Sequence, residues 1–137
     1  VNLKTYTIAN ANELNQTSQT MLSKVDAVIV PSDNTIAGSM GVLVKNADAV
    51  NKPVFPSADT MVKDGGVASI SLSQYGQGKA AGKITARILK GEKPGQMAVN
   101  NYHHGEPVLN LKQARKLGIK VPADFQREAE QHGTVFK

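Results

Sequence analysis

The sequence predicts an α/β fold, a three-layer structure in which a parallel β-sheet is flanked by helices. Two observations support this prediction. Short apolar runs, such as Val25–Val30, are typical of strands that are covered on both faces of a sheet. These runs alternate with segments whose apolar residues recur at helical spacing, which favours parallel strands joined by right-handed crossovers. The length of 137 residues suits one unit of this kind.

The first half of the chain contains three predicted strands. Val1–Ile8 alternates in character and is rich in β-branched residues, so it predicts a strand. Val25–Val30 predicts the second strand, and the third begins at Val54–Phe55. Three helices are expected between and after these strands: one from an N-cap at Asn10 or Asn12 to about Lys24, one after Pro31–Thr35 to about Asn51, and a short one ending at Asp64-Gly65-Gly66.

The second half begins with a fourth predicted strand, Val67–Leu72. A long helix follows at about 77–89, with Ala81, Ile84 and Ile88 on one face and Gly91 after its end. The remaining predictions are short strands at Met97–Asn100 and Pro107–Asn110, a helix at Leu111–Leu117, a last helix at Asp124–Gln131, and a frayed tail.

Composition excludes several classes of protein. The absence of Cys excludes disulfide scaffolds, thiol nucleophiles and Cys-ligated metal centres. The longest apolar runs are far shorter than the ~20 residues of a membrane-spanning helix. The net charge of +5 suggests nucleic acid, but the three Tyr and three Phe are widely separated and the basic residues are spread over helix surfaces. A nucleic-acid partner is therefore not expected.

The sequence contains no arrangement of residues that predicts catalysis. His103-His104 stand together without an acidic partner or a third metal ligand at suitable spacing. Gly76, Gly78 and Gly82 lack the spacing of a dinucleotide-binding loop and are interpreted as close helix packing. We therefore expect a protein that is not an enzyme and that has no cofactor and no metal site.

Polar residues follow each of the first four predicted strands. These segments are Ala9–Asn12, Pro31–Thr35, Ser57–Thr60 and Ser73–Tyr75. In an open α/β sheet, ligands bind outside the carboxyl ends of the strands, so these segments are the candidate site. The same residue types cap helices and form turns, and this second interpretation stays open. The carboxylate of Asp33 suits an ammonium or hydroxyl group.

Three stretches resemble a known family. They are VDAVIVPSDNTIAGSM at 25–40, KPVFPSADTMVKDGGVASISLSQYGQGKAAGKITARILKGEKP at 52–94, and VLNLKQARKLGIKVP at 108–122. Their order resembles the C-terminal half of ABC-transporter substrate-binding proteins of the tryptophan/tyrosine-type family, which have the type I periplasmic-binding-protein fold. His103-His104 depart from the pattern of that family.

The resemblance implies two lobes with a ligand cleft between them. Residues 1–72 would form the second lobe, 73–106 would cross to a first lobe not present in this chain, and 107–137 would return and form the C-terminal helices. The implied ligand-binding residues are Asn10, Ser32, Asp33, Asn34, Thr35, Ser57, Ala58, Asp59, Ser73, Gln74 and Tyr75.

The function implied is that of the solute-binding component of an ABC importer, which binds an amino acid, and specifically an aromatic one, by hinge closure. Its partners would be the membrane subunits of the transporter, and its location periplasmic or extracellular, with a lipid anchor as one form. The alternative is the effector-binding domain of a LacI-type transcription regulator. Discriminating between them requires the upstream sequence.

The chain opens inside a predicted strand, without a leader-like segment, so we expect a piece of a longer protein. The apolar face of the helix at 77–89 then lacks the sheet of the first lobe. Exposed apolar surface of this kind usually finds a partner. We expect this helix to fold back, to swap between chains, or to be buried in a homo-oligomer.

Overall fold

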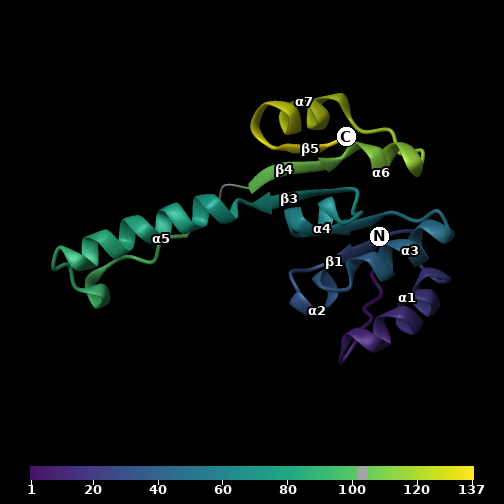
Figure 1. The fold of residues 1–137 in the computed structure, drawn as a ribbon, viewed down its shortest axis with the longest axis horizontal. Coiled ribbons are helices and arrows are strands. Elements are labelled where there is room, and N and C mark those ends of the chain that lie inside the picture. Colours follow the sequence, from purple (N-terminus) through teal and green to yellow (C-terminus); the bar gives the residue numbers. More distant parts are fainter. Residues whose placement is uncertain (102–104) are drawn as a thin grey trace.

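The computed structural model describes residues 1–101 and 105–137, and it confirms the α/β class. Figure 1 shows a body of strands and helices from which one long helix projects as an arm. The strands are β1 (Val28–Val30), β2 (Val54–Pro56), β3 (Ala68–Leu72), β4 (Gly105–Asn110) and β5 (Thr134–Phe136). The helices are η1 (Ala11–Glu13), α1 (Leu14–Leu22), α2 (Asn34–Ala37), α3 (Met40–Ala49), α4 (Asp59–Lys63), α5 (Gln74–Leu89), η2 (Pro94–Gln96), α6 (Leu111–Lys116) and α7 (Ala123–His132).

The first three strands run in the same direction. β1 pairs with β2 in parallel, with Val30 opposite Pro56. β3 lies beside β2, because the Val67 amide donates to the Val54 carbonyl at 2.8 Å and the Asp59 amide donates to the Ser71 hydroxyl at 3.2 Å. The carboxyl ends of β1, β2 and β3 therefore meet at one edge of the body.

Within the described residues the strands form two sheets, β1–β2 and β3–β4–β5, and one strand pair departs from the parallel arrangement that the sequence predicts. β4 runs antiparallel to β3, with Leu72 opposite Gly105, whereas β5 runs parallel to β4. The physical reason is the path of the chain. It leaves the body at the end of β3, travels along α5, and returns at the same edge, so the strand after the return must run back (Figure 1).

Two expected strands do not form, and one unexpected strand does. Val1–Ile8 and Met97–Asn100 contain no strand, because an alternating pattern gives only propensity and neither segment has a hydrogen-bonded neighbour. The tail expected to fray instead pairs with β4, and Val135 packs beside Leu109 and Ala129. The free energy gained by burying Val135 outweighs the conformational entropy lost when the end of the chain becomes ordered.

The core lies where α1 and α3 cover β1 and β2. The most deeply buried side chains there include Leu22, Met40, Leu43 and Val54. The single helix predicted to reach Asn51 is divided at Gly38-Ser39 into α2 and α3, and the second piece contributes the buried face. These contacts hold the strand ends, and hence the polar segments that follow them, in fixed positions.

Asn110 ties the end of β4 to two other elements. Its side-chain amide donates to the Val62 carbonyl at 3.0 Å, and its oxygen accepts from the Gln113 amide at 2.9 Å. Its backbone amide donates to the Val67 carbonyl at 2.8 Å. The side chain is buried, and these bonds satisfy it while capping α6. The returning strand is thereby fixed in register against the body.

Helix α5 extends away from the body and contains no buried residue. It begins at Gln74, three residues earlier than expected, because the Ser73 hydroxyl accepts from the Gly76 amide at 3.1 Å and caps it. The expectation that this helix folds back is wrong for the single chain. The chain after α5 runs along the arm through η2 instead, and the apolar stripe at Ile84 and Ile88 meets no element of the body.

Candidate functional site

The ends of β1 and β2 bring two serine hydroxyls together. β1 and β2 are in register up to Val30 and Pro56, and the next polar residues are Ser32 and Ser57. Their Oγ atoms lie 2.9 Å apart, and both side chains are exposed. This contact between residues 25 positions apart in the sequence shows that the segments Pro31–Thr35 and Ser57–Thr60 lie side by side on one surface.

Asp33 caps helix α2 at the same edge. Its Oδ1 accepts a hydrogen bond from the Ile36 amide at 2.8 Å. The other carboxylate oxygen makes no hydrogen bond to the described residues and is available to solvent. Asn34 and Thr35 form the exposed first turn of α2 beside it. The capping interpretation is therefore confirmed for Asp33, and capping leaves one oxygen available to a ligand.

The ends of β2 and β3 form the next part of this surface. Ala58 occupies the N-cap position of α4 without a side-chain hydrogen bond. Asp59 follows it, half-buried, with its amide bound to Ser71 and its Oδ1 accepting from the Thr60 amide at 2.8 Å. Ser73 stands at the end of β3, where it caps α5. We call the surface formed by Ser32–Thr35, Ser57–Asp59 and Ser73–Tyr75 the polar rim.

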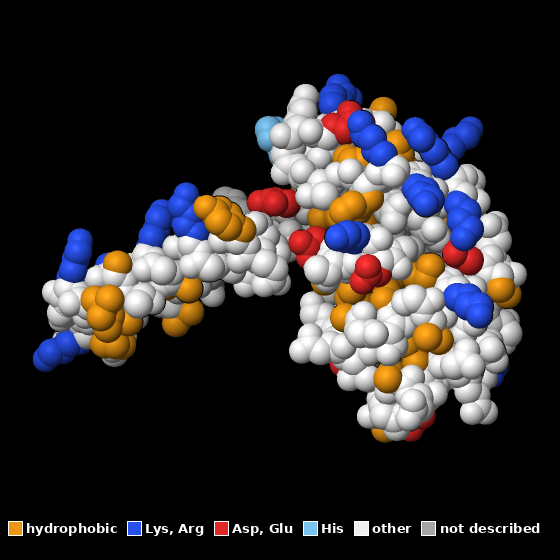
Figure 2. All heavy atoms as spheres, in the orientation of Figure 1, with side chains coloured by type: hydrophobic (Ala, Val, Ile, Leu, Met, Phe, Trp, Pro, Cys, Tyr) orange, Lys and Arg blue, Asp and Glu red, His pale blue; other side chains and the backbone are white. Residues whose placement is uncertain are grey.

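A hollow of about 360 Å³ lies where the arm leaves the body. Four predicted site residues line it: Asp59, Ser73, Gln74 and Tyr75. Tyr75 is 81 % exposed, so its ring faces outward and is free to meet another surface. Figure 2 shows acidic side chains gathered at this junction.

Glu106 also lines this hollow, although the sequence pattern does not predict it as a site residue. It lies in β4 opposite Ser71, because the antiparallel strand brings its amino end to the edge where β3 finishes. The candidate site was predicted from polar residues that follow the carboxyl ends of strands. Glu106 lies near the amino end of its strand, so this criterion does not select it. The feature that predicts its position is the return of the chain after α5. A chain that leaves and re-enters the body at the same edge must continue in a strand antiparallel to β3.

The charge around the hollow is negative. Asp59 and Glu106 are the charged residues that line it, whereas the chain as a whole has a net charge of +5. Two carboxylates beside hydroxyl and amide groups suit a ligand with a cationic group, such as an ammonium. The clear pKa shifts in the described residues occur elsewhere, at Arg87 and Glu92 in the arm.

Asn10 is not part of the polar rim by any contact in the structure. Its side-chain oxygen accepts from the Asn12 amide at 3.0 Å, and its amide donates to Glu13 at 3.0 Å, so it caps η1. It lines neither the hollow at the arm nor the second hollow described next.

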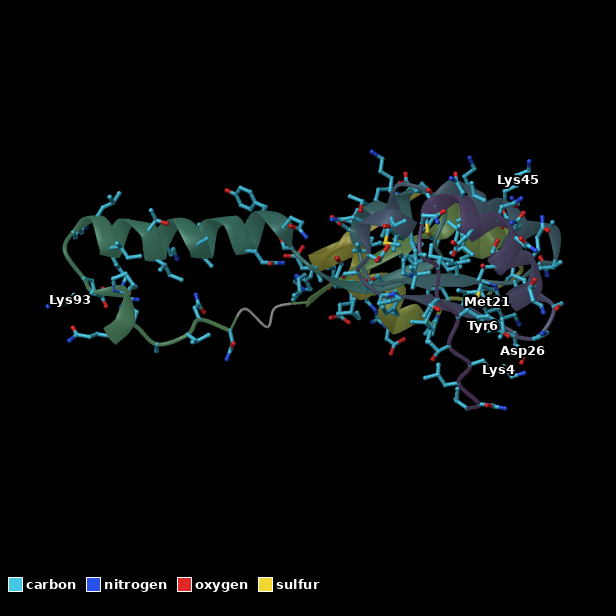
Figure 3. The ribbon with its side chains drawn as sticks, turned by 90° about the horizontal axis from the view of Figure 1, so that it is seen from below. Lys4, Tyr6, Met21, Asp26, Lys45 and Lys93 are labelled. Carbon is cyan, nitrogen blue, oxygen red and sulfur yellow. The ribbon has the colours of Figure 1, made fainter. Side chains whose placement is uncertain are left out.

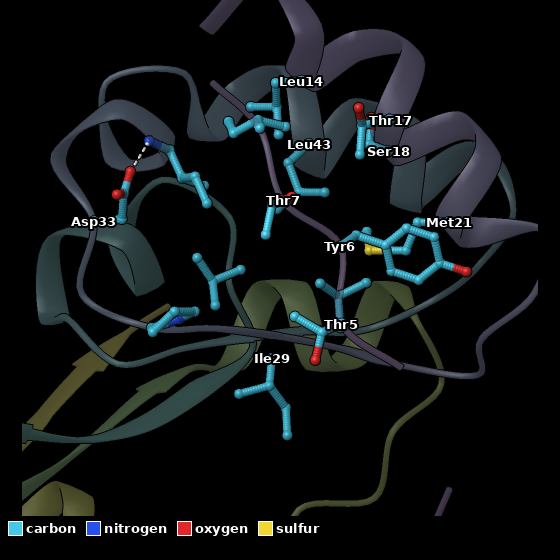
Figure 4. Close-up of a pocket in the computed structure, with 15 residues that line it drawn as sticks. Thr5, Tyr6, Thr7, Leu14, Thr17, Ser18, Met21, Ile29, Asp33 and Leu43 are labelled. Atoms are coloured by element: carbon cyan, nitrogen blue, oxygen red, sulfur yellow. Dashed lines mark hydrogen bonds between the residues drawn. The ribbon is translucent and has the colours of Figure 1, made fainter. Parts of the chain in front are cut away.

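A second hollow of about 320 Å³ lies between residues 5–8, helix α1 and β1. Figure 4 shows Tyr6 beside Met21 on one side and Asp33 on the other, and Figure 3 places Tyr6 and Met21 where the N-terminal segment meets the body. Its walls are mainly apolar, including Leu14 and Leu43.

His103-His104 lie outside the described residues. Among residues 1–101 and 105–137, no three His, Asp or Glu side chains are grouped in a way that would hold a metal ion. Within the same residues, no helix is both long enough and apolar enough to cross a bilayer.

The structure is a mixed α/β fold in which three strand ends converge on the polar rim. Residues 1–133 match the family described as ABC transporter substrate binding protein, and the chain belongs to this family. A tyrosine-binding protein of Clostridioides difficile (strain R20291) is 28% identical over 118 residues, which cover 85% of this chain and 34% of that protein.

Solved structures show the same relationship. An ABC domain from Streptococcus pneumoniae in complex with L-Trp is 39% identical with a TM-score of 0.89, covering 99% of this chain and 45% of that one. A conserved domain protein from Vibrio cholerae is 26% identical with a TM-score of 0.82, covering 96% of this chain and 43% of that one. The ligand-free, open structure of a substrate-binding protein with adhesive properties from Clostridium difficile is also 26% identical, with a TM-score of 0.72 and coverages of 95% and 42%.

The chain thus spans less than half the length of each of these relatives. The family is one of binding proteins that serve transporters. None of the relatives named above is described as a transcription regulator, so the LacI-type alternative gains no support from them.

Proposed function

We propose that this chain is one lobe of the solute-binding component of an ABC importer and that its polar rim is half of a cleft for an amino acid. The observation that supports this most strongly is the convergence of three strand ends on one edge, shown by the Ser32–Ser57 contact and the Asp59–Ser71 bond. Family membership supplies the transport context.

The division of the chain follows from the same proposal. Residues 1–72 form the ligand-binding lobe, 73–106 cross to a first lobe encoded upstream, and 107–137 return to the body. The arm supports this division, because α5 projects from the rim and its apolar stripe at Ile84 and Ile88 meets no element of the body. A sheet in the first lobe is the cover that this stripe would need.

The proposed chemistry of binding uses groups with complementary charge. Asp59 and Glu106 line the hollow at the arm and offer carboxylate oxygens to the ligand ammonium. Elsewhere on the polar rim, Asp33 offers a further carboxylate oxygen, and Ser32, Thr35 and Ser57 offer hydroxyl groups that donate to a carboxylate. A ligand that touches both lobes stabilises the closed form, so binding shifts the open–closed equilibrium. No covalent step is required.

An aromatic amino acid is the proposed ligand. Two similar proteins are described as tyrosine-binding and as a complex with L-Trp. The exposed ring of Tyr75 beside the hollow offers a surface for stacking against a second ring. The site of action proposed is periplasmic or extracellular, at the membrane subunits of a transporter, with a lipid anchor as one form of attachment.

Calorimetric titration of the two-lobe protein with L-Trp, L-Tyr, L-Ala and L-Glu tests this proposal. We expect L-Trp or L-Tyr to bind with micromolar or tighter affinity and L-Ala to bind at least tenfold more weakly. A two-lobe protein that binds none of these amino acids would contradict the proposed ligand class.

A further inference from the structure

The positive charge of this chain is concentrated on the arm. Residues 73–101 contain five basic side chains and one acidic side chain, a net charge of +4, and the whole chain has +5. The single acid, Glu92, forms an ion pair with Arg87. The exposed lysines Lys79, Lys83, Lys90 and Lys93 remain without an acidic partner among the described residues. Figure 3 labels Lys93 at the far end of the arm.

Three of these lysines form a row on one side of α5. At about 100° of rotation per residue, Lys79, Lys83 and Lys90 fall within an arc of roughly 40° and extend over about 16 Å of the helix axis. The apolar stripe of Ala81, Ile84 and Ile88 lies roughly 150° around the helix. Figure 2 shows basic side chains along one side of the arm. We call Lys79, Lys83 and Lys90 the lysine stripe.

The position of this stripe is unfavourable for an isolated helix. Lys79 and Lys83 are four residues apart, as are Lys83 and Arg87, and like charges at this spacing repel. No acidic residue stands three or four positions from Lys79 or Lys83. The helix dipole favours cations only in the last turn, so it accounts for Arg87 and Lys90 and not for Lys79 or Lys83. An anionic partner outside the helix would remove this repulsion.

We propose that the lysine stripe is a docking surface for the anionic phospholipid headgroups of a membrane. Lysine ammonium groups act as point charges that suit a diffuse layer of phosphates, whereas bidentate recognition of one carboxylate or phosphate favours arginine. Among the described residues of the arm, Tyr75 is the aromatic residue nearest the stripe, four positions before Lys79, and a single ring does not provide the row of stacking platforms that nucleobases need. The stripe faces away from the apolar side of α5, so it stays accessible when that side is covered. This surface adds a membrane contact to the proposed solute binding and does not depend on which ligand is bound.

Sedimentation of the chain with vesicles tests the proposal. We expect binding to vesicles that contain phosphatidylglycerol, weaker binding to vesicles of pure phosphatidylcholine, and loss of the difference at high salt. The variant Lys79→Gln/Lys83→Gln/Lys90→Gln should bind phosphatidylglycerol vesicles about a hundredfold more weakly, because each lysine near an anionic surface is worth roughly a factor of five.

A matched control removes the same number of charges from another face. Lys112→Gln/Arg115→Gln/Lys120→Gln alters exposed cations on α6 and the turn after it, and it should retain most of the binding. Circular dichroism establishes that both variants keep the helical content of the wild type. Three results would each overturn the proposal. The first is a wild-type protein that binds phosphatidylglycerol vesicles no better than phosphatidylcholine vesicles. The second is a stripe variant that binds as tightly as the wild type, and the third is a control variant that loses as much vesicle binding as the stripe variant.

Discussion

Asp33 has a capping role in the structure and a proposed role in ligand binding. One oxygen of its carboxylate holds the Ile36 amide at 2.8 Å, and the other makes no hydrogen bond to the described residues. A cap needs an acceptor oxygen, whereas an ammonium ligand gains most from the negative charge. The two roles can therefore be separated by substitutions that keep one and remove the other.

The first prediction uses this separation. Asp33→Asn keeps an oxygen for the Ile36 amide, so the free energy of unfolding should change by less than about 0.5 kcal/mol, while amino-acid binding by the two-lobe protein weakens by ~1.5–3 kcal/mol. Asp33→Ala should lose ligand affinity to a similar extent and also lose about 1 kcal/mol of stability. Urea denaturation and calorimetry measure the two effects. Unchanged affinity in Asp33→Asn would leave Asp33 as a cap alone.

The candidate site was only partly predictable from the sequence. Strand ends that run in parallel place Ser32, Asp33, Ser57 and Asp59 at one edge, and this follows from an alternating pattern of strands and helices. Glu106 was not predictable by that rule, because it begins a strand whose reversed direction depends on the path of the arm. Asn10 was predicted as a site residue, and no contact in the structure joins it to the polar rim.

At the scale of elements, β5 depends on a close approach between two backbones. A Cβ added to Gly133 would collide with the carbonyl oxygen of Pro107, where β5 begins its pairing with β4. Only glycine fits this position without moving one of the two strands. The pairing of β5 with β4 therefore depends on Gly133, which precedes the strand and is not one of its apolar residues.

The second prediction follows from this contact. Gly133→Ala should separate β5 from β4 and lower the free energy of unfolding by about 1–3 kcal/mol, because the overlap must be relieved by a backbone shift. Gly41→Ala is the matched control. It lies within α3, and an added Cβ meets nothing within 4 Å, so it should be neutral or stabilise by about 0.5–1 kcal/mol. Equal stability of the Gly133 variant and the wild type would contradict the account of β5.

The third prediction concerns the end of α5. The Arg87 guanidinium donates to the Glu92 carboxylate, at 2.6 Å from its Nε, and lowers the pKa of Glu92 below its ordinary value. This hydrogen bond stabilises the folded form above the ordinary glutamate pKa, and the contribution is lost as the pH falls through the lowered pKa of Glu92. Carboxyl-carbon NMR titration should show the lowered pKa in the wild type and an ordinary pKa in Arg87→Gln. The same pKa in both proteins would contradict it.

Helices and strands were predicted correctly where the local sequence pattern determines the structure. The predictions failed where a strand forms only by pairing with a segment distant in the sequence. The helices at 14–22 and 40–49 follow from the helical spacing of their apolar residues. Val1–Ile8 has the composition of a strand, yet a strand exists only beside a hydrogen-bonding neighbour. Thr134–Phe136 shows the converse, since a short tail becomes a strand because β4 offers it an edge.

The molecule as a whole consists of a packed body and an uncovered arm. Ile88 is 38% exposed and Leu89 is 83% exposed on a helix with no buried residue. The body, in contrast, closes around the contacts of α1, α3 and α7. This unequal distribution of apolar surface predicts the behaviour of the chain in solution.

The fourth prediction is that the isolated chain associates through α5. Light scattering after size-exclusion chromatography should give a dimer or larger species, and Ile84→Asp/Ile88→Asp should shift it to the monomer. Lys112→Asp, an exposed change on α6, should leave the association unchanged. The prediction would be contradicted if the wild-type chain were strictly monomeric while α5 remained helical, because the apolar stripe would then be stable in contact with solvent.

The two hollows lie where other segments of the chain join the body, one beside α5 and one beside the N-terminal segment. The hollow at the arm lies where α5 leaves the body, so a lobe that covers α5 would close over it. The hollow beside residues 5–8 lies under the N-terminal segment, which precedes the body in the chain.

The fifth and most direct test compares ligand binding by the 137-residue chain with binding by the protein that also contains the proposed upstream lobe. Titration of both with L-Trp and L-Tyr, under the same conditions, measures whether the polar rim suffices alone. We expect micromolar or tighter binding by the two-lobe protein and binding at least a hundredfold weaker by the isolated chain. Equal, tight binding by the isolated chain would contradict the claim that the rim is half of a cleft.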